Sequence, residues 1–400
     1  MHCFRKVTED LYWIGGNDRR LELFENLFPI PRGVCYNSYL LMDDKTVLLD
    51  TVDASIGRQF LENIEAVLDG RDLDYLVIDH MEPDHCSLIQ DLMVRYPDLQ
   101  LIGNTKTFPI IQQFYQIDLT DKTITVKEGD TISCGKHTLH FVMAPMVHWP
   151  EVMMTYDEKD KVLFSADAFG SFGALNGTIF NDELNFERDW LDDARRYYTN
   201  IVGKYGVQVQ NVLKKAAALD IETICPLHGP VWRSNLEYFI DKYQKWSTYE
   251  PELQGVTIAY GSMYGNTENM ANVLAALLAD AGIRHIRVHD ISKTHVSELI
   301  ADTFKYSHLV LACPTYNGGI YPLMSGFLDD MKALSLQNRT VAVLGNGTWA
   351  PQSAKQIEAR INEMKNMTLL TENFAVKSAL HEDHMEQLRE LSAKIVSSMK

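Results

Sequence analysis

The sequence lacks paired cysteines, long apolar runs and a secretion signal. Its six cysteines are scattered and form no CxxC pair, which argues against a zinc ribbon, a rubredoxin-type iron site and a thioredoxin motif. No apolar run reaches the roughly 18 residues that a membrane helix requires, and no N-terminal segment resembles a signal peptide. These absences predict a cytoplasmic protein with free thiols.

The sequence is also poor in positive charge. It has 37 Lys and Arg against 54 Asp and Glu, a formal net charge of −17. Nucleic acids and anionic membranes bind clustered basic side chains, so neither is expected as a partner. The Gly-Lys-Thr of a P-loop and the GxGxxG of a dinucleotide site are absent too. At 400 residues, the chain is expected to form two domains.

The sequence does contain a cluster of side chains that can bind a metal ion, and it follows the apolar run 75–78. The segment reads His-Met-Glu-Pro-Asp-His, and its four such residues are His80, Glu82, Asp84 and His85. A buried strand is expected at 75–78, and a strand is a rigid base from which to present ligands. Taken alone, the segment is also compatible with a solvated loop.

Three later residues favour the metal site. His148, Asp167 and His228 each follow an apolar stretch that reads as a strand. A single His is most often a structural residue. Strand ends along one edge of a fold, however, can converge on a shared site, so the three residues and the His-Met-Glu-Pro-Asp-His segment together predict a metal centre.

The first part of the chain is rich in strand patterns with helices interspersed, which predicts two sheets with helices outside them. A hairpin is expected around 43–45 and a helix over 56–68. Residues 189–219 read as mostly helical, with Gly203 and Gly206 as interruptions. The polar stretch 247–254 is the candidate linker.

After this stretch strand and helix alternate regularly, which predicts a doubly wound parallel sheet. The five predicted strand–helix pairs are 256–260 with 267–281, 286–289 with 293–303, 309–312 with 323–334, 340–344 with 352–364, and 367–370 with 385–399.

Three loops that follow strands of this sheet predict a ligand site, because such sheets bind ligands at the carboxyl ends of their strands. The first loop opens onto a helix and offers backbone N–H groups, hydroxyls and a helix N-terminus to a phosphate, although an ordinary turn remains an alternative. Tyr316 and Trp349 could stack on a ring or fill core. The candidate residues are Ser262, Met263, Tyr264, Gly265, Asn266, Thr267, Pro314, Thr315, Tyr316, Asn317, Gly318, Gly319, Gly345, Asn346, Gly347, Thr348, Trp349 and Ala350.

Residues 1–250 resemble a metallo-β-lactamase-like domain, an αββα sandwich whose hallmark is H-x-H-x-D-H, usually with two zinc ions and hydrolytic activity. Glu82 stands at the position of the second His, and H-x-E-x-D-H is the pattern of the flavodiiron proteins. A carboxylate is a harder ligand than imidazole and suits iron that cycles between two oxidation states.

The resemblance implies a ligand set for two irons. His80, Glu82 and His148 would hold one iron, Asp84, His85 and His228 the other, and Asp167 would bridge them. Asp84 and His85 are adjacent and are expected to point in different directions, which leaves open whether His85 binds iron in every state.

Residues 251–400 resemble flavodoxin, which binds FMN. Flavodoxins usually carry Ser or Thr at the position of Tyr264, a change that flavodiiron proteins commonly tolerate. Domain order and length are similar to the minimal two-domain flavodiiron proteins. Two alternatives are a zinc hydrolase with a fused flavodoxin module and an electron carrier with a degenerate metal domain. Glu82 argues against the hydrolase, and the intact ligand set argues against degeneracy.

The resemblance implies a reductase that passes electrons from FMN to a non-haem diiron site and reduces O2 to water, NO to N2O, or both, detoxifying these gases in an anaerobic or microaerobic cell. FMN stores two electrons and each ferrous ion supplies one, which matches the four that O2 requires. Rubredoxin or a reduced deazaflavin is the implied donor. A head-to-tail homodimer, or a dimer of such dimers, is the implied assembly. The preference between O2 and NO stays open.

Overall fold

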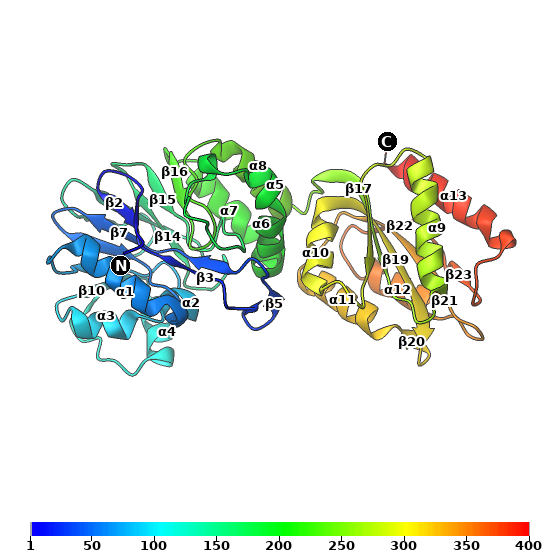
Figure 1. Ribbon diagram of the computed structural model, residues 1–400, viewed down its shortest axis with the longest axis horizontal. Coiled ribbons are helices and arrows are strands. Elements are labelled where there is room, and N and C mark those ends of the chain that lie inside the picture. Colours follow the sequence, from blue (N-terminus) through cyan, green and yellow to red (C-terminus); the bar gives the residue numbers. More distant parts are fainter. Residues whose placement is uncertain (1, 400) are drawn as a thin grey trace. The chain divides into compact units, whose positions relative to one another are not determined.

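The computed structural model describes residues 2–399, which form two compact units (Figure 1). The first unit runs to Tyr198 and resumes over Val207–Gln244, and the second comprises Thr199–Gly206 and the chain from Lys245 onward. Helix α8 ends at Ser247 and strand β17 begins at Leu253, so the connection is shorter than the predicted linker 247–254. No helix in residues 2–399 has the length and apolar character needed to cross a bilayer.

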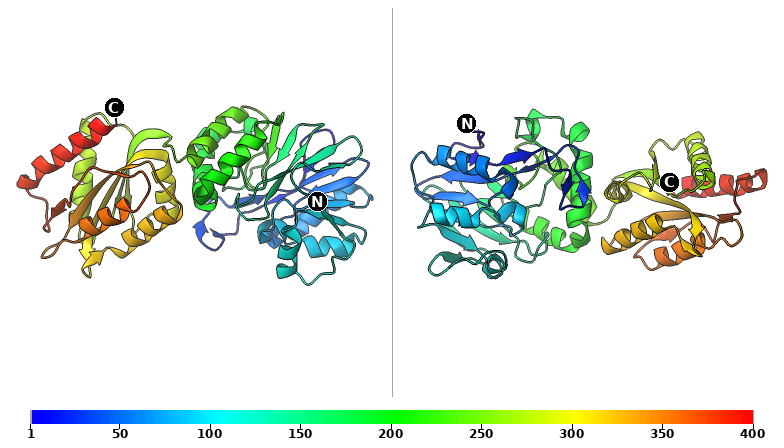
Figure 2. Two further views of the ribbon diagram at one scale, coloured as in Figure 1. Left: turned by 180° about the vertical axis from the view of Figure 1, so that it is seen from behind. Right: turned by 60° about the horizontal axis from the view of Figure 1, so that its bottom comes forward.

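Two sheets form the centre of the first unit (Figure 2). The seven-stranded sheet has the order β1-β2-β7-β8-β9-β10-β11, and the five-stranded sheet runs from β12 to β16 in sequence order. The strands of the first sheet are β1 (Arg5–Lys6), β2 (Leu11–Trp13), β7 (Tyr39–Met42), β8 (Thr46–Leu49), β9 (Tyr75–Val77), β10 (Gln100–Gly103) and β11 (Thr123–Thr125). Those of the second are β12 (Thr131–Ser133), β13 (Thr138–Met143), β14 (Met153–Asp157), β15 (Val162–Phe164) and β16 (Thr223–Cys225).

Two short hairpin-like pairs, which the sequence did not predict, complete the strands of this unit. Strand β3 (Gly16–Asp18) pairs with β6 (Val34–Tyr36), and β4 (Leu23–Phe24) pairs with β5 (Phe28–Pro29). The predicted hairpin around 43–45 is confirmed, because β7 and β8 pair antiparallel up to Met42 and Thr46.

The helices of the first unit lie outside the two sheets (Figure 1). Helix α1 buries Phe60, Ile64 and Leu68 and ends at Asp69, which adopts a left-handed conformation. The mostly helical stretch predicted over 189–219 is interrupted by a π-helical turn and a 3₁₀ turn, and the second turn and α7 begin at Gly203 and Gly206, the predicted points of interruption. The helices are α1 (Gly57–Leu68), α2 (Pro83–Cys86), α3 (Ile89–Arg95), α4 (Thr107–Phe114), α5 (Phe186–Asp189), α6 (Leu191–Tyr197), α7 (Gly206–Ala216) and α8 (Leu236–Ser247), with the two turns at Tyr198–Val202 and Gly203–Tyr205.

A tight packing contact helps to explain the break. A Cβ atom added at Gly206 would lie 2.3 Å from the carbonyl oxygen of Ser247. Only glycine allows this approach, so the residue at which α7 starts must lack a side chain.

The strand directions decide where the site residues can meet. Strand β14 is antiparallel to both β13 and β15, and β15 is parallel to β16. Strands β13, β15 and β16 therefore point the same way, and their carboxyl ends lie along one edge of the second sheet. His148, Asp167 and His228 follow these three strands.

The second unit is built on a parallel sheet of order β18-β17-β19-β21-β22. This order is the doubly wound arrangement of flavodoxin-like folds, so the fold class predicted for both halves of the chain is confirmed. The strands are β17 (Leu253–Tyr260), β18 (Ile286–Asp290), β19 (Tyr306–Tyr316), β21 (Thr340–Asn346) and β22 (Thr368–Leu369), with β20 (Gly319–Ile320) beside β19 and β23 (Ala375–Val376) beside β21.

Helices cover both faces of this sheet, each over its own apolar core. Helices α9 and α13 pack on one face, where Met270, Leu274 and Leu388 meet the strand residues Ile258 and Val310. The other three helices pack on the opposite face. The helices are α9 (Asn266–Asp280), α10 (Val296–Lys305), α11 (Pro322–Ala333), α12 (Ser353–Asn362) and α13 (Glu382–Ser398).

Acidification is expected to destabilise this unit through His308. The ring is 4% exposed, and Ser307 Oγ and Ser398 Oγ lie 2.8 and 3.0 Å from its two nitrogens. Burial lowers the pKa of His308 from 6.5 to about 4. Between these values the unfolded chain binds a proton that the folded chain does not, so stability falls as pH falls.

We expect the wild-type protein to lose about 2 kcal/mol of unfolding free energy through this residue between pH 7 and pH 5. The measurement is urea unfolding of the purified protein at both pH values. His308→Gln should show a pH dependence smaller by this amount, and equal slopes for the two proteins would contradict the assignment.

Candidate metal centre and cofactor pocket

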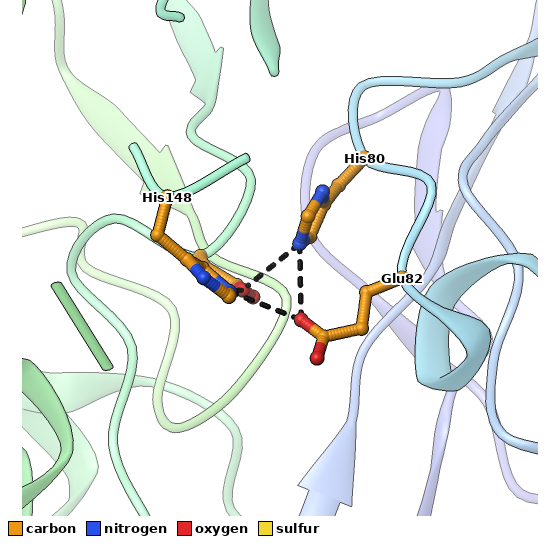
Figure 3. A group of neighbouring side chains, drawn as sticks. His80, Glu82 and His148 are labelled. Carbon is orange, nitrogen blue, oxygen red and sulfur yellow. Dashed lines mark hydrogen bonds and ion pairs between the residues drawn. The ribbon is translucent and has the colours of Figure 1, made fainter. Parts of the chain in front are cut away.

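Four predicted ligands meet at one point, and we call them the first group: His80, Glu82, His148 and Asp167. His80 Nε2 lies 3.2 Å from Glu82 Oε2, and His148 Nε2 lies 3.0 Å from the same oxygen. Asp167 Oδ2 lies 3.0 Å from His148 Nε2 and 3.4 Å from His80 Nε2. Figure 3 shows His80 and Glu82 reaching the point from one segment and His148 from the opposite side.

The second group consists of Asp84, His85 and His228. The two Nε2 atoms of His85 and His228 lie only 3.1 Å apart, and Asp84 Oδ2 lies 3.4 and 3.2 Å from them, respectively. Adjacent ligands Asp84 and His85 therefore point to the same place, and the expectation that they diverge is wrong. Both lie on the short helix α2, where Pro83 occupies the first turn.

Asp167 connects the two groups. Its Oδ2 faces the first group, whereas its Oδ1 lies 3.2 Å from His85 Nε2 and 3.7 Å from His228 Nε2 in the second. One carboxylate thus offers one oxygen to each group, which is the geometry of a bridging ligand.

The chemistry of the two groups fits metal ions. The imidazole nitrogens and carboxylate oxygens of each group lie within 4.8 Å of one another. Both carboxylate oxygens of Asp84, and Oδ1 of Asp167, are buried without a hydrogen-bond partner among the described residues. Buried, unpaired carboxylate oxygens are costly unless a cation compensates them.

The electrostatics of the first group favour a charged carboxylate. Burial disfavours the charged form of Glu82, but hydrogen bonds from His148 and His80 outweigh it, and the pKa of Glu82 lies well below its ordinary value. Burial likewise lowers the pKa of His148, but hydrogen bonds to Asp167 and Glu82 raise it to about 9. The cluster stabilises positive charge at its centre, where protonated imidazoles stand in for metal ions.

Two outer contacts that the sequence did not predict orient the histidines. Glu151 Oε1 accepts the Nδ1–H of His80 at 2.9 Å, and the backbone oxygen of Cys35 accepts the Nδ1–H of His228 at 2.7 Å. Each contact fixes the proton of the neutral ring on Nδ1, so that Nε2 is the nitrogen presented to a bound metal. The residues that make these contacts lie 71 and 193 positions away in sequence, which is why no local pattern predicts them.

The aromatic wall of the second group was also not predicted. The rings of Phe24, Tyr36 and Tyr197 lie 5.4, 5.6 and 5.4 Å from the ring of His228. The hydroxyl of Tyr197 is buried and has no hydrogen-bond partner among residues 2–399. These rings shield one side of the second group from water.

A third group of possible ligands, His137, Asp157 and Asp160, already contains a cation. The ammonium of Lys159 lies 3.1 Å from His137 Nε2 and 3.0 Å from Asp160 Oδ1. On its other side, His137 Nδ1 lies 2.8 Å from Asp157 Oδ2. Asp160 thus pairs with the lysine and Asp157 with His137, so both carboxylates of this group have partners without a metal.

The three predicted loops of the second unit surround a cavity of about 480 Å³ at the carboxyl ends of β17, β19 and β21. Gln352 and Ser378, which were not predicted, also line it. Of the predicted residues, those lining the cavity are Ser262, Met263, Tyr264, Asn266, Thr267, Pro314, Thr315, Tyr316, Asn317, Gly318, Asn346, Gly347, Thr348, Trp349 and Ala350.

Gly265, Gly319 and Gly345 do not line the cavity, but two of them shape it. Gly265 precedes α9 with φ of +86°, which glycine adopts without strain, and its N–H donates to Ser262 Oγ at 3.1 Å. Gly345 lies in β21, where a Cβ atom would approach that of Ala354 to 2.9 Å. Gly265 and Gly345 thus affect the shape of the cavity through their backbone conformation and packing, although neither lines it.

Large aromatic side chains stand exposed at the mouth of the cavity. Tyr264 is 91% exposed and Trp349 is 89% exposed. The interpretation that Trp349 fills core is therefore wrong. Exposed aromatic rings beside a cavity suit stacking on a planar ligand.

Comparisons with known proteins match both parts of the chain. A family model described as "ODP family beta lactamase" matches residues 34–229, and one described as "Flavodoxin" matches residues 258–391. The chain is 32% identical over 363 residues to the anaerobic nitric oxide reductase flavorubredoxin of Vibrio vulnificus, covering 89% of this chain and 72% of that protein.

Solved structures with the same arrangement cover nearly the whole chain. The rubredoxin oxygen:oxidoreductase of Desulfovibrio gigas is 29% identical, with a TM-score of 0.91 over 99% of this chain and 98% of that one. The flavodiiron protein of Giardia intestinalis is 24% identical, with a TM-score of 0.90 over 99% and 97% of the two chains, a similarity that shows the fold alone.

Proposed function

The chain belongs to the flavodiiron proteins, and on this premise we propose that its first and second groups hold one iron ion each while its three loops hold FMN. It is an oxidoreductase that uses FMN and a non-haem diiron centre to reduce O2, NO or both. The observation that carries the residue assignment is Asp167, whose two oxygens face separate groups.

The first iron is proposed to bind His80, Glu82 and His148, and the second Asp84, His85 and His228, with Asp167 between them. His85 is included because its Nε2 lies within the second group in this structure. Carboxylates supply three of the seven side chains, and oxygen-rich sites with imidazole suit iron better than the nitrogen-rich tetrahedral sites of zinc. Bound iron supplies one-electron chemistry and open coordination positions for a diatomic gas.

The side chains around the irons have defined tasks. Burial of the His80, His85 and His228 rings keeps bulk water away from the ligands, and the Glu151 and Cys35 contacts hold the tautomers that present Nε2. The alternative of an electron carrier with a degenerate metal domain is disfavoured, because all seven candidate ligands lie within the two groups.

FMN is proposed to place its phosphate at the N-terminus of α9. Ser262 and Thr267 offer hydroxyls there, and the first turn of α9 offers unpaired N–H groups. Trp349 and Tyr264 at the mouth are proposed to flank the isoalloxazine ring, with Tyr316 beside them.

Partners and location are proposals of the same kind. The similar oxidoreductase of Desulfovibrio gigas is named for rubredoxin and oxygen, which supports a rubredoxin as the donor. A reduced deazaflavin is the alternative donor. We propose a cytoplasmic homodimer, or a dimer of dimers, in which the flavin of one subunit serves the iron centre of the other.

The test is anaerobic reduction of the purified protein followed by timed addition of O2 or NO, with metal and product analysis. We expect two irons and one FMN per chain, and water or N2O as product. Two zinc ions without iron, in a protein that retains activity, would overturn the assignment and favour the zinc hydrolase.

A further inference from the structure

Three of the four buried histidines in the two groups, His80, His85 and His228, differ in what their Nδ1 atoms contact. His80 donates to a carboxylate, Glu151, whereas His228 donates to a neutral backbone carbonyl, that of Cys35. His85 Nδ1 has no hydrogen-bond partner among the described residues. Figure 3 shows the second ring nitrogen of His80 on the side of the ring that faces away from the first group.

Glu151 is held firmly in this position. Its side chain is 1% exposed, and Oε1 also accepts the backbone N–H of Met81 at 2.9 Å. The amide of Asn104 donates to the backbone oxygen of Glu151. Oε1 thus accepts two N–H groups, from the His80 ring and the Met81 backbone, and both contacts suit the charged carboxylate form of Glu151. Glu151 thus places a fixed negative charge behind the first group.

No such charge backs the histidines of the second group. Each group has one carboxylate of its own, Glu82 or Asp84, and the two share Asp167. Glu151 is a carboxylate in contact with Nδ1 of a ligand histidine, and Nδ1 of His85 and of His228 has no carboxylate partner among residues 2–399, so Glu151 distinguishes the first group from the second. A carboxylate that accepts from Nδ1–H makes Nε2 of the ring a more basic ligand, and a more basic, more anionic ligand set stabilises Fe(III) relative to Fe(II).

Resting on the proposed iron assignment, we infer that Glu151 is a positioning residue that lowers the reduction potential of the iron bound by His80 and so sets the order in which the two irons are reduced. The iron of the second group takes the first electron, and the iron of the first group takes the second. Reduced FMN gives up two electrons and two protons to become oxidised FMN, and each Fe(III) that accepts one electron becomes Fe(II).

Glu151→Gln tests this inference with little change of shape. The amide oxygen can still accept from His80 and Met81, but the charge is gone. Removal of an outer partner of a metal ligand typically costs 10- to 100-fold in metal affinity. We expect a chelator to remove one ferric ion per chain roughly 10- to 100-fold more readily than from the wild type, while the other stays bound.

A second readout is the mixed-valence state, followed by EPR during an anaerobic redox titration. In Glu151→Gln the reduction potentials of the two irons should become closer in value. The comproportionation constant of the Fe(II)Fe(III) state should therefore fall roughly 10- to 100-fold. A merely structural role of Glu151 would leave the separation of the two potentials unchanged.

Asp157→Asn is the matched control. Asp157 makes the same carboxylate contact, at 2.8 Å, to Nδ1 of a buried histidine, but that histidine is His137 of the third group. Both readouts should equal those of the wild type. If Glu151→Gln does not fold, Glu151→Asp replaces it, because Asp keeps the charge but moves it away from His80 by one methylene. In Glu151→Asp the separation of the two iron potentials should lie between those of the wild type and of a protein without the charge.

The outcomes separate this inference from the iron assignment on which it rests. Unchanged ferric retention and an unchanged mixed-valence state in Glu151→Gln overturn the inference, while two irons in the wild type keep the assignment. A wild-type protein that binds no iron overturns the assignment itself.

Discussion

Replacement of Asp167 by Asn is expected to lower O2 or NO consumption by more than roughly 100-fold while FMN stays bound. Loss of an outer partner alone costs 10- to 100-fold in metal affinity or activity, and Asp167 faces both groups directly. Asn keeps the shape but loses the charge, and one of its two ends becomes an N–H₂ donor that cannot bind a metal. At least one of the two groups then loses its shared ligand.

The measurements are gas consumption with an electrode, iron per chain by elemental analysis, and FMN per chain from its absorbance after release. Asp157→Asn, a buried Asp-to-Asn change in the same unit, should leave all three unchanged. His148→Ala should resemble Asp167→Asn, because it removes a ligand of the first group. Wild-type gas consumption in Asp167→Asn would show that the reaction does not depend on the two groups.

The convergence of the seven candidate ligands could be predicted, because strands that run in the same direction end at the same edge of a sheet. His148, Asp167 and His228 follow three strands that run the same way, so their meeting needs no information beyond the strand pattern. The His-Met-Glu-Pro-Asp-His segment follows β9 of the other sheet. That its residues join the same site required only that the two sheets pack face to face.

The parts that the sequence left hidden depend on side-chain direction and on long-range contacts. The turn of α2 brings Asp84 and His85 to one point, although neighbouring residues were expected to diverge. Glu151 and Cys35 reach their histidines through tertiary packing, and nothing in the neighbourhood of Cys35 marks it as a contact of His228. In the case of Glu151, its position just before a strand and three residues after a candidate ligand was the available signal.

In the flavin loops, too, some cavity residues could be predicted from the sequence and others could not. The loops that follow β17, β19 and β21 were predictable, because a parallel sheet gathers the loops at its carboxyl edge. Ser378 was not, because it reaches the cavity from the segment after β23. Its Oγ lies 3.0 Å from Thr348 Oγ1, so it also ties two loops of the cavity together.

Ser262→Asp is expected to weaken FMN binding by more than roughly 100-fold without loss of iron. The Asp carboxylate can accept the Gly265 N–H that Ser262 accepts at 3.1 Å, so the turn before α9 is kept. A negative charge about 5 Å from a phosphate costs roughly 3 kcal/mol per unit of phosphate charge at an effective dielectric of about 20, and 1.4 kcal/mol is a factor of ten in affinity. The iron groups lie in the other unit and should keep their metal.

The measurement is fluorescence titration of the deflavinated protein with FMN, and with riboflavin, which has the same ring system but no phosphate. Ser262→Asp should bind riboflavin as the wild type does and FMN far more weakly, because only FMN carries charge to the altered loop.

Ser335→Asp is the control: it adds the same charge at an exposed turn of the same unit, at φ of +60°, which Asp tolerates. Equal loss of both flavins would mean that the loop is distorted, and unchanged FMN affinity would place the phosphate elsewhere in the cavity. Since electrons reach the irons through FMN, gas consumption by Ser262→Asp should fall with FMN occupancy and recover as FMN is added in excess, which separates a weakened cofactor site from a damaged iron centre.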